Sequence, residues 1–182
     1  MLYFLSVKSD KRRFLPLVFG ITFCVISAMT SLFLHRVCGF VINYTDSLPR
    51  GIYQLRPIKK EIERNMIVAL AVPEHVQSLV YGRKWLFKGT MLMKPVAAIP
   101  GDKILISENG LYINERYFGP VFSFDSDGLP LPEIRISYTL RDRQVFLASR
   151  YKKSFESRYF GHVYIKNIIA EALPILTFKG RT

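Results

Sequence analysis

The sequence predicts a mainly β protein, an antiparallel β domain that follows one transmembrane helix. Three observations support this fold class. Residues 14–34 form an uncharged run of 21 residues that is predominantly apolar. Short apolar runs of strand length, closed by proline or glycine, recur through the rest of the chain. One stretch, residues 103–118, alternates apolar residues on both sides of Asn109-Gly110, a dipeptide preferred in tight hairpin turns.

The apolar run at residues 14–34 is long enough, at ~1.5 Å per residue, to cross a hydrocarbon core of ~30 Å. Lys8, Lys11, Arg12 and Arg13 precede it against one acid, Asp10, and this excess places the N-terminus in the cytoplasm. A cleaved signal peptide would have a shorter run and a small-residue cleavage site, and a buried core helix seldom stays apolar for this length. We therefore expect a basic cytoplasmic segment at residues 1–13, a membrane span at 14–34 and an extracytoplasmic domain at 35–182.

The elements of this domain follow in chain order. Strands are predicted at residues 52–58 and 66–72, a short helix at 74–83 and a buried strand at 90–99. The hairpin at 103–118 comes next, followed by a loop at 123–132 that is rich in Gly, Pro and Asp. Later strands are predicted at 144–149 and 162–173, with a polar stretch at 150–161 between them.

Charge and composition exclude several classes of function. The net charge is +12, but the chain contains no nucleic-acid-binding motif, so we expect no nucleic-acid partner and attribute the basic surface to solvent and anionic lipid. The two cysteines lie in or just after the span, and the three histidines are isolated, so no metal site or disulfide framework is predicted. We expect no cofactor.

Two residues have the local setting of a catalytic pair. Ser47 lies in YTDSLPRGIY, residues 44–53, two residues before the rigid Pro49. A serine can be activated by a neutral lysine, but a free lysine has a pKa of ~10.4, so such a base must lie in an apolar pocket. Lys94 meets this requirement because it stands within the apolar strand MLMKPVAAI, residues 91–99. The alternatives are that Ser47 is a turn residue and that Lys94 reaches solvent from a sheet edge.

Three blocks in this order resemble the signal peptidase I family of Ser/Lys membrane proteases. They are SLP at 47–49, KPVAAIPGD at 94–102 and SFESRYFG at 154–161. Because Pro95 replaces the arginine that usually follows the base lysine, the chain is most similar to the TraF-type conjugative transfer peptidases. That branch implies action on pilin precursors or other exported proteins of conjugation, in some members with ring closure instead of hydrolysis.

The resemblance implies a role for each matching residue. Ser47 would be the nucleophile and Lys94 the general base. The backbone N–H of Ser47 and the hydroxyl of Thr45 would stabilise the oxyanion, and Ser154 would orient the amine of Lys94. Glu156 and Arg158 would form a supporting ion pair under the site. Pro100, Gly101 and Asp102 would shape the turn after the base strand.

The chain departs from the family pattern at two points. Glu156 stands where the family commonly has aspartate, and residues 148–155 lack the Gly-Asp-Asn of housekeeping members. The first departure must move the ion pair by about one methylene.

We therefore expect a single-pass serine endopeptidase of the inner membrane, with its catalytic domain on the periplasmic side. Its partners would be the lipid bilayer and a membrane-held precursor, because Ser47 follows the span by at most ~45 Å of extended chain. Two alternatives remain: a general type I signal peptidase, and a non-catalytic membrane assembly factor that would tolerate the loss of Ser47 or Lys94.

Overall fold

The structure of the protein is a computed structural model that describes residues 11–178. Most of the basic segment predicted at residues 1–13 therefore lies outside the described part. The chain divides into two compact units, residues 1–39 and 40–182.

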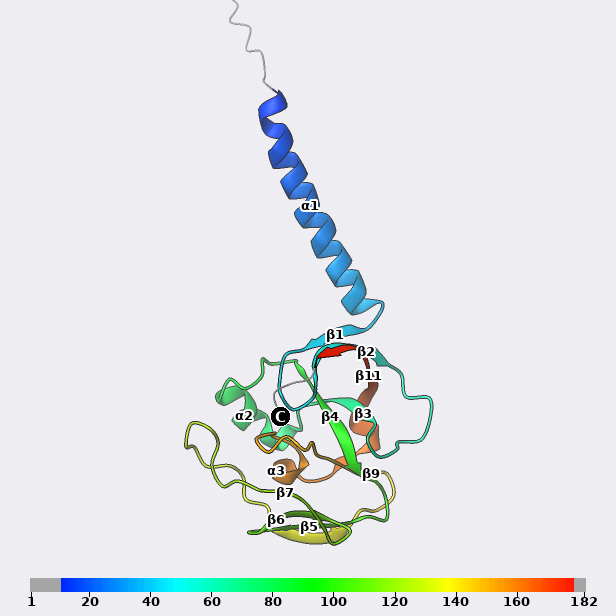
Figure 1. Ribbon diagram of the computed structural model, residues 1–182, viewed down its shortest axis with the longest axis vertical. Coiled ribbons are helices and arrows are strands. Elements are labelled where there is room, and N and C mark those ends of the chain that lie inside the picture. Colours follow the sequence, from blue (N-terminus) through cyan, green and yellow to red (C-terminus); the bar gives the residue numbers. More distant parts are fainter. Residues whose placement is uncertain (1–10, 179–182) are drawn as a thin grey trace, which may run out of the picture. The chain divides into compact units, whose positions relative to one another are not determined.

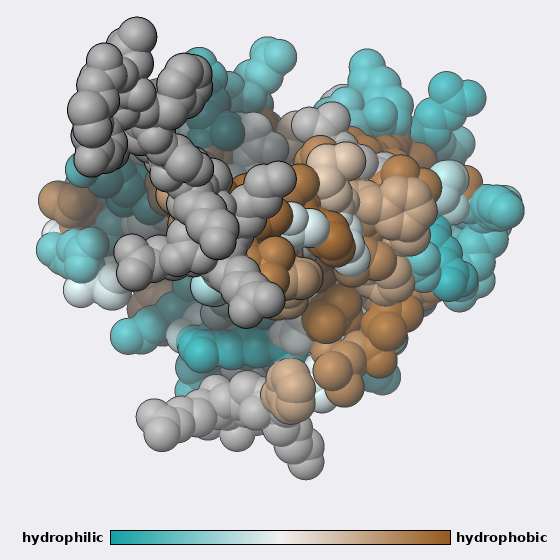
Figure 2. All heavy atoms as spheres, turned by 90° about the horizontal axis from the view of Figure 1, so that it is seen from above, coloured by the Kyte–Doolittle hydropathy of each residue, from teal (hydrophilic) through white to brown (hydrophobic). Residues whose placement is uncertain are grey.

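The first unit contains one long helix, α1 (Lys11–Arg36). Its segment Phe14–His35 has 22 residues and a mean hydropathy of 2.2, and at ~1.5 Å per residue it matches a hydrocarbon core of ~30 Å. The large apolar side chains along it are exposed. Figure 2 colours the side chains by hydropathy and shows hydrophobic ones exposed on the face that it displays. By length and composition, this one N-terminal apolar helix suggests single-pass membrane anchoring.

The second unit is built from two antiparallel sheets (Figure 1). The larger sheet has the order β1-β2-β11-β3-β4-β9-β10, with strands at Phe40–Asn43, Arg50–Arg56, Ile168–Phe178, Ile67–Ala71, Met91–Ala98, Gln144–Leu147 and Val163–Tyr164. The smaller sheet has the order β7-β6-β5-β8, with strands at Arg116–Gly119, Gly110–Ile113, Lys103–Ser107 and Ile136–Thr139. Two short helices, α2 (Glu74–Gly82) and α3 (Ser157–Phe160), and a 3₁₀ turn at Ile165–Asn167 complete the unit. The predicted mainly β, antiparallel fold class is confirmed.

Strand β11 lies between β2 and β3 and pairs with both. Its approach to β2 is so close at Gly51 that an added Cβ would lie 2.0 Å from the carbonyl oxygen of Leu176. Gly51 also has a φ of +150°, which residues with a side chain rarely adopt. Only glycine therefore fits at this position, four residues after Ser47.

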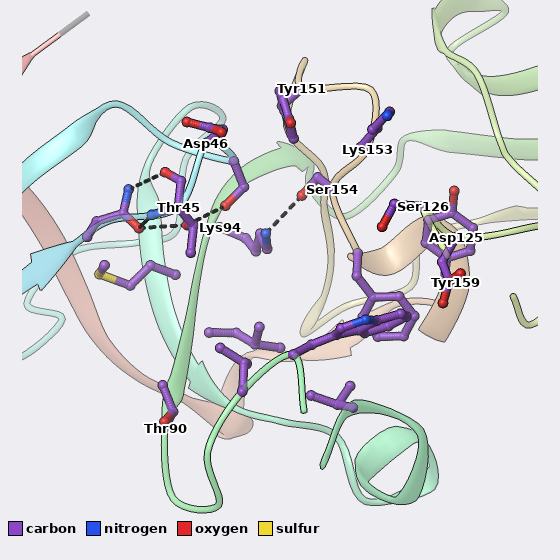
Figure 3. Close-up of a pocket in the computed structure, with 18 of the residues that line it drawn as sticks. Thr45, Asp46, Thr90, Lys94, Asp125, Ser126, Tyr151, Lys153, Ser154 and Tyr159 are labelled. Atoms are coloured by element: carbon purple, nitrogen blue, oxygen red, sulfur yellow. Dashed lines mark hydrogen bonds between the residues drawn. The ribbon is translucent and has the colours of Figure 1, made fainter. Parts of the chain in front are cut away.

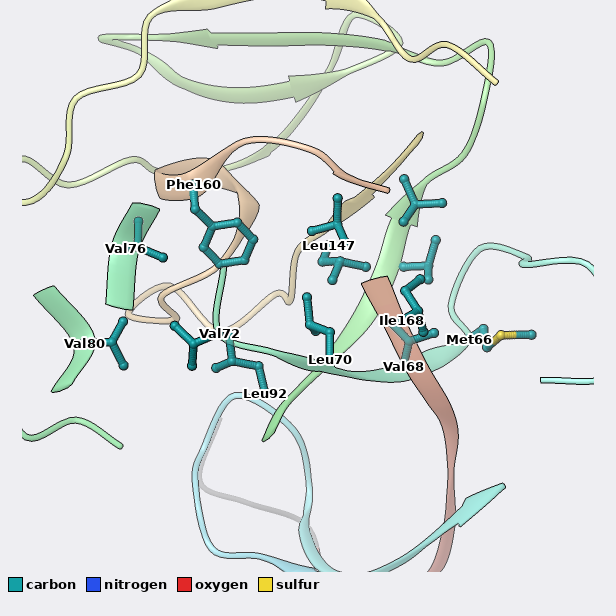
Figure 4. Close-up of a cluster of buried hydrophobic side chains, with 13 residues drawn as sticks. Met66, Val68, Leu70, Val72, Val76, Val80, Leu92, Leu147, Phe160 and Ile168 are labelled. Atoms are coloured by element: carbon teal, nitrogen blue, oxygen red, sulfur yellow. The ribbon is translucent and has the colours of Figure 1, made fainter. Parts of the chain in front are cut away.

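The main hydrophobic core lies against β3, β4 and β9 (Figure 4). Strand β4 alternates between half-buried and buried positions along its whole length, as a strand with one inward face does. Helix α2 adds Val76 and Val80 to the same cluster. The prediction of a buried strand at residues 90–99 is confirmed, and so is the short helix at 74–83.

The predicted hairpin at residues 103–118 is present, but its turn differs from the prediction. Ser107 pairs with Gly110, so the two-residue loop is Glu108-Asn109, not Asn109-Gly110. The second half of the stretch divides at Asn114 and Glu115, which have φ values of 49° and 65° and separate β6 from β7. Two consecutive positive φ values are the mark of a primed hairpin turn, here built without the glycine that usually signals it.

Two strands have no counterpart in the prediction. β1 (FVIN) and β8 (ISYT) have four residues each, and each lies at an edge of its sheet. Strands this short contain too few alternations to stand out in the sequence.

Candidate active site

Ser47 lies in the turn that joins β1 to β2. The next residue, Leu48, is buried in a small cluster with Tyr53 and Ala172. The Tyr53 hydroxyl, itself in a fully buried residue, donates a hydrogen bond of 2.7 Å to the carbonyl oxygen of Pro49. Tyr53 of β2 therefore holds the turn through two contacts, with the side chain of Leu48 and with the carbonyl group of Pro49. Ser47, just before these residues, is half-buried.

Asn43, the last residue of β1, organises the same turn from the other side. Its side-chain amide nitrogen lies within 3.0–3.2 Å of three carbonyl oxygens, those of Thr45, Leu48 and Pro49. Its side-chain oxygen accepts from the backbone N–H of Thr45 at 3.2 Å and from the Thr45 hydroxyl at 2.7 Å. The Thr45 hydroxyl thus donates to Asn43, so its 3.3 Å contact with Ser47 has the Ser47 hydroxyl as donor.

Lys94 occupies an inward position of β4, on the same face as Leu92 and Val96. It pairs with Val68 of β3 on one side. On its other side β4 pairs with β9, and this pairing ends at Pro95. The carbonyl oxygen of Pro95 accepts a hydrogen bond from the backbone N–H of Ala148. Pro95 has no N–H to donate in return. The proline thus stands at the end of the β9 ladder, where a missing donor costs little.

The amine of Lys94 is buried and donates a hydrogen bond of 2.8 Å to the hydroxyl of Ser154. Burial lowers the pKa of Lys94 from 10.5 to about 8. The negative charge of Glu156 opposes this shift, and the positive charge of Arg158 adds to it. A substantial fraction of the amine is therefore neutral near pH 8 and able to accept a proton.

Glu156 and Arg158 form an ion pair, with 2.5 Å between guanidinium and carboxylate, and their side chains are 0% and 1% exposed. Glu156 also accepts a hydrogen bond of 2.7 Å from the backbone N–H of Ser149, and Arg158 donates to the carbonyl oxygens of Ser149 and Pro120. Burial raises the pKa of Glu156, while the neighbouring guanidinium and amine lower it. Through these hydrogen bonds the ion pair joins residues 149–158 to Pro120, which follows β7.

Ser47, Thr45, Lys94 and Ser154 all line one cavity of about 540 Å³. Figure 3 shows Lys94 and Ser154 joined by their hydrogen bond, with Thr45 on the neighbouring segment. The structure thus brings Ser47, Thr45, Lys94 and Ser154 together. Glu156 and Arg158 do not line the cavity, but their charges act on the pKa of Lys94.

The two proposed partners do not bond to one another in this arrangement. Within residues 11–178, the amine of Lys94 is hydrogen-bonded to Ser154, and no hydrogen bond joins it to Ser47, whose hydroxyl contacts Thr45 instead. Catalytic hydrogen bonds are often long or poorly aligned in the absence of substrate, so this arrangement does not exclude the pair.

Asp102 anchors the turn after the base strand, as predicted for the Pro100–Asp102 block. It accepts hydrogen bonds from the backbone of Ile99 and the side chain of Asn114, and it pairs with Arg64. Burial alone would raise its pKa, but these hydrogen bonds and the guanidinium keep the pKa below its usual value. The contacts are structural and lie outside the cavity lining.

Sequence reasoning did not identify Asn43, although the buried side chain makes more bonds in the turn than any predicted site residue. Its signal in the sequence was an Asn two residues before Thr45, the spacing at which asparagine bonds its own backbone two residues on. No group of three or more metal-ligating side chains is found among residues 11–178.

Residues 12–177 match a family described as "Signal peptidase, peptidase S26". The chain is 29% identical over 163 residues to "Conjugal transfer protein TraF" of Agrobacterium tumefaciens (strain 15955), which covers 84% of this chain and 90% of that protein. It is 31% identical over 153 residues to "Plasmid transfer protein TraF" of Escherichia coli, which covers 78% of this chain and 85% of that protein.

A solved structure of a signal peptidase I from Enterococcus faecalis V583 is similar over 62% of this chain and 97% of its own length. The TM-score is 0.36 and the sequence identity 20%.

Proposed function

Because the chain belongs to the signal peptidase family, peptidase S26, and to its TraF-type branch, we propose that it is a membrane-anchored serine endopeptidase with a Ser47/Lys94 dyad. Its substrates would be pilin precursors or other exported proteins of conjugative transfer. The family match supports a peptidase, and the names of the relatives support a role in conjugation.

One observation carries the proposal. Lys94 is a buried lysine, 5% exposed, that lines the same cavity as Ser47 and whose pKa is lowered to about 8. A purely structural lysine would reach solvent with its amine, because burying an ammonium without a counter-ion in contact is costly. A buried amine whose pKa is lowered toward neutral pH, in the same cavity as a serine, suits a general base.

The reaction would proceed through an ester on Ser47. Lys94 takes the hydroxyl proton as Oγ attacks the scissile carbonyl carbon, and it gives the same proton to the amine that leaves when the C–N bond breaks. Water, activated by the now neutral Lys94, then attacks the ester and releases Ser47. If a free amine of the same substrate attacks instead, the product is a ring that is lighter than the hydrolysed form by one water.

The backbone N–H of Ser47 would donate to the oxyanion, since it is at the start of the chain segment that Asn43 and Tyr53 hold in place. The hydroxyl of Thr45 would be the second donor. Because it donates to Asn43 at rest, this role requires a rotation about its side chain, and each such donor contributes ~3 kcal/mol to transition-state stabilisation.

We place the N-terminus in the cytoplasm, the helix in the inner membrane and the catalytic unit in the periplasm. The basic residues before the span favour this orientation. Because at most ~45 Å of extended chain separates Ser47 from the span, we propose that the precursor is itself membrane-held.

The test is the processing of a candidate pilin precursor that is co-expressed with the full-length protein. Intact mass spectrometry of the precursor would compare the unmodified protein with Ser47→Ala and Lys94→Ala. Both substitutions are expected to abolish processing while the protein still accumulates in the membrane. A product one water lighter than the linear form would identify ring closure.

The chain offers matched controls, because Ser126 and Lys153 are exposed residues that line the same cavity. Ser126→Ala and Lys153→Ala should process normally. Normal processing by Ser47→Ala would instead support the non-catalytic assembly factor, and processing of unrelated signal-peptide precursors by the unmodified protein would support a general signal peptidase.

A further inference from the structure

His162 is a half-buried histidine that contacts both sheets of the second unit. Its ring lies 5.7 Å from the ring of Tyr138 on β8, in the smaller sheet. It also lies 5.2 Å from the ring of Tyr164 on β10, in the larger sheet. Its Nε2 atom is 3.0 Å from the side-chain amide nitrogen of Gln144 on β9. The proposed reaction gives this histidine no role.

The hydrogen bonds of Gln144 determine which atom of the pair donates. The side-chain oxygen of this buried residue accepts a hydrogen bond of 2.9 Å from the backbone N–H of Arg141. A backbone N–H can only donate, so the amide group has one orientation, with its nitrogen toward His162. Nε2 of His162 must therefore accept, and the ring is neutral with its proton on Nδ1.

A proton on Nε2 would place two donors against one another. The amide group of Gln144 would have to turn over to present its oxygen to His162. Its nitrogen would then face the N–H of Arg141, which is also a donor. Since an unpaired buried polar group is costly, the protonated ring and the hydrogen bond from Arg141 exclude one another.

The hydrogen bond from Arg141 belongs to the turn that joins β8 of the smaller sheet to β9 of the larger one. Its residues 141–143 are exposed, and they carry two arginines and one aspartate. Arg143 has a φ of +64°, which residues with a side chain rarely adopt. Its carbonyl oxygen accepts a hydrogen bond of 2.9 Å from the backbone of Ile165. The side chain of Gln144 and the backbone of Ile165 thus hold this turn at its two ends.

The side chains that contact the ring of His162 are uncharged. Burial lowers the pKa of His162, and no charge among residues 11–178 contributes to this shift. Burial raises the pKa of Tyr138 to about 12, a rise that the backbone of His162 opposes, so this phenol stays neutral in the range of a histidine. The amine of Lys166 lies 5.8 Å from the centre of the Tyr164 ring. Within the described part of the chain, no counter-ion therefore stabilises an imidazolium at this position.

From this arrangement we propose that His162 is an acid-sensitive switch between the two sheets. The neutral ring accepts from Gln144 and holds the 141–143 turn, and protonation of Nε2 breaks this contact and releases the turn. His162 also directly follows the 154–161 segment, so its release would loosen the end of the segment that contains Ser154. The switch goes beyond the proposed peptidase and does not depend on it.

The sign of the effect follows from the proton balance. A histidine of the unfolded chain has a pKa of ~6.5, and burial lowers the pKa of His162 in the folded protein. The stability that the neutral ring contributes is therefore complete above about pH 6.5. It decreases as the pH falls from there toward the lowered pKa.

The first measurement is nuclear magnetic resonance of the full-length protein in detergent, with isotope-labelled histidine, between pH 8 and pH 5. It follows the three histidines of the chain, His35, His75 and His162. The signals that His162→Gln removes should show a neutral ring with its proton on Nδ1, which takes up the second proton below pH 6.5. A proton on Nε2 of this ring at pH 8 would overturn the switch.

The second measurement is amide hydrogen exchange in peptides that cover residues 136–147. The unmodified protein is compared with His162→Gln, whose side-chain oxygen can accept from Gln144 but cannot be protonated. Comparison at equal pH cancels the intrinsic effect of pH on exchange and the titration of Glu156, whose pKa is raised by burial. The two proteins should exchange equally at pH 7.5. At pH 5.5 the unmodified protein should exchange at least about threefold faster.

His75 supplies the matched control. Its Nε2 atom lies 3.1 Å from the carbonyl oxygen of Phe160, which can only accept, so protonation keeps this bond. His75→Gln should therefore retain the faster exchange at pH 5.5. Equal exchange of the unmodified protein and His162→Gln at pH 5.5 would overturn the switch, and so would an acid response that only His75→Gln removes. If His162→Gln does not fold, the titration of the unmodified protein, with the histidines assigned through His75→Gln, still decides the question.

Discussion

The amine of Lys94 donates a hydrogen bond of 2.8 Å to the hydroxyl of Ser154, a residue that lies 60 positions later in the chain. Strand β4 supplies the lysine and the segment after β9 supplies the serine. This bond fixes the orientation of the proposed base at rest, and it points the amine into the cavity that Ser47 also lines.

Ser154→Ala should lower kcat by tenfold to a hundredfold, values that correspond to about 1.4–2.7 kcal/mol. The physical reason is that the amine loses its acceptor and samples other directions. KM for a peptide substrate should change little, because Ser154 orients the base and is not proposed to bind substrate. Ser154→Thr, which keeps the hydroxyl, should restore most of kcat. A rise in KM with unchanged kcat would contradict the orienting role.

The rate should depend on pH through Lys94. Its pKa is lowered to about 8 by burial, and only the neutral amine can take a proton from Ser47. kcat/KM should therefore fall about tenfold per pH unit below pH 8 and level off above it. The measurement is a pH–rate profile with a peptide substrate at constant ionic strength. A rate independent of pH between 6 and 9 would exclude Lys94 as the base.

Glu156→Gln should change that profile and also weaken the fold. The carboxylate raises the pKa of Lys94, so its removal should move the acid limb of the profile below pH 8. It would also leave Arg158 buried without a counter-ion, which costs about 3–5 kcal/mol in the free energy of unfolding. Thermal unfolding and the pH–rate profile check the two effects. Glu115→Gln, in an exposed ion pair with Lys103, is the control and should alter neither.

Asn43→Ala should lower kcat and destabilise the turn that contains Ser47. The substitution removes the amide nitrogen that bonds three carbonyl oxygens and the oxygen that accepts from Thr45. Unpaired buried polar groups cost about 1–3 kcal/mol each. Asn43→Asp keeps the acceptor but turns a carboxylate toward the carbonyls, so it should be no better than alanine. Recovery of kcat in Asn43→Asp would show that only the bond to Thr45 matters.

Gly51→Ala should be strongly destabilising, by at least about 3 kcal/mol, since the new Cβ would meet the backbone of Leu176 at 2.0 Å in a conformation that favours glycine. Gly128→Ala is the matched control. Gly128 also has a positive φ, +77°, but open space around it, so only the backbone strain of about 1 kcal/mol remains. Equal losses of unfolding free energy in the two variants would refute the steric argument.

The sequence contained the local features of this site but not its distant ones. Lys94 was recognisable because its neighbours are apolar, and the strand around it was predicted within one residue at each end. Ser47, Ser154 and Glu156 were recognisable by family resemblance. These features are all carried by residues next to one another in the chain.

What could not be predicted depends on partners far apart in the chain. The pairing of Arg83 with Asp125 joins residues 42 positions apart and holds Asp125, which lines the cavity, yet neither residue stands out in the sequence. The turn at Asn114-Glu115 was missed because its left-handed backbone is imposed by the pairing of β6 with β7 and not by a glycine.

The position of β11 in the sheet sets an order of assembly. The Ser47 turn leads into β2, and Lys94 lies on β4. These two strands belong to one sheet only because β11 is inserted between β2 and β3. β11 is also the last strand of the described chain, Ile168–Phe178. A nascent protein that has been made or exported only as far as α3 already contains Ser47, Lys94 and Ser154, but it lacks the strand that sets the first two at their working separation. On the proposed function, a chain synthesised only as far as α3 would therefore be inactive, and activity would require β11 to be in place between β2 and β3.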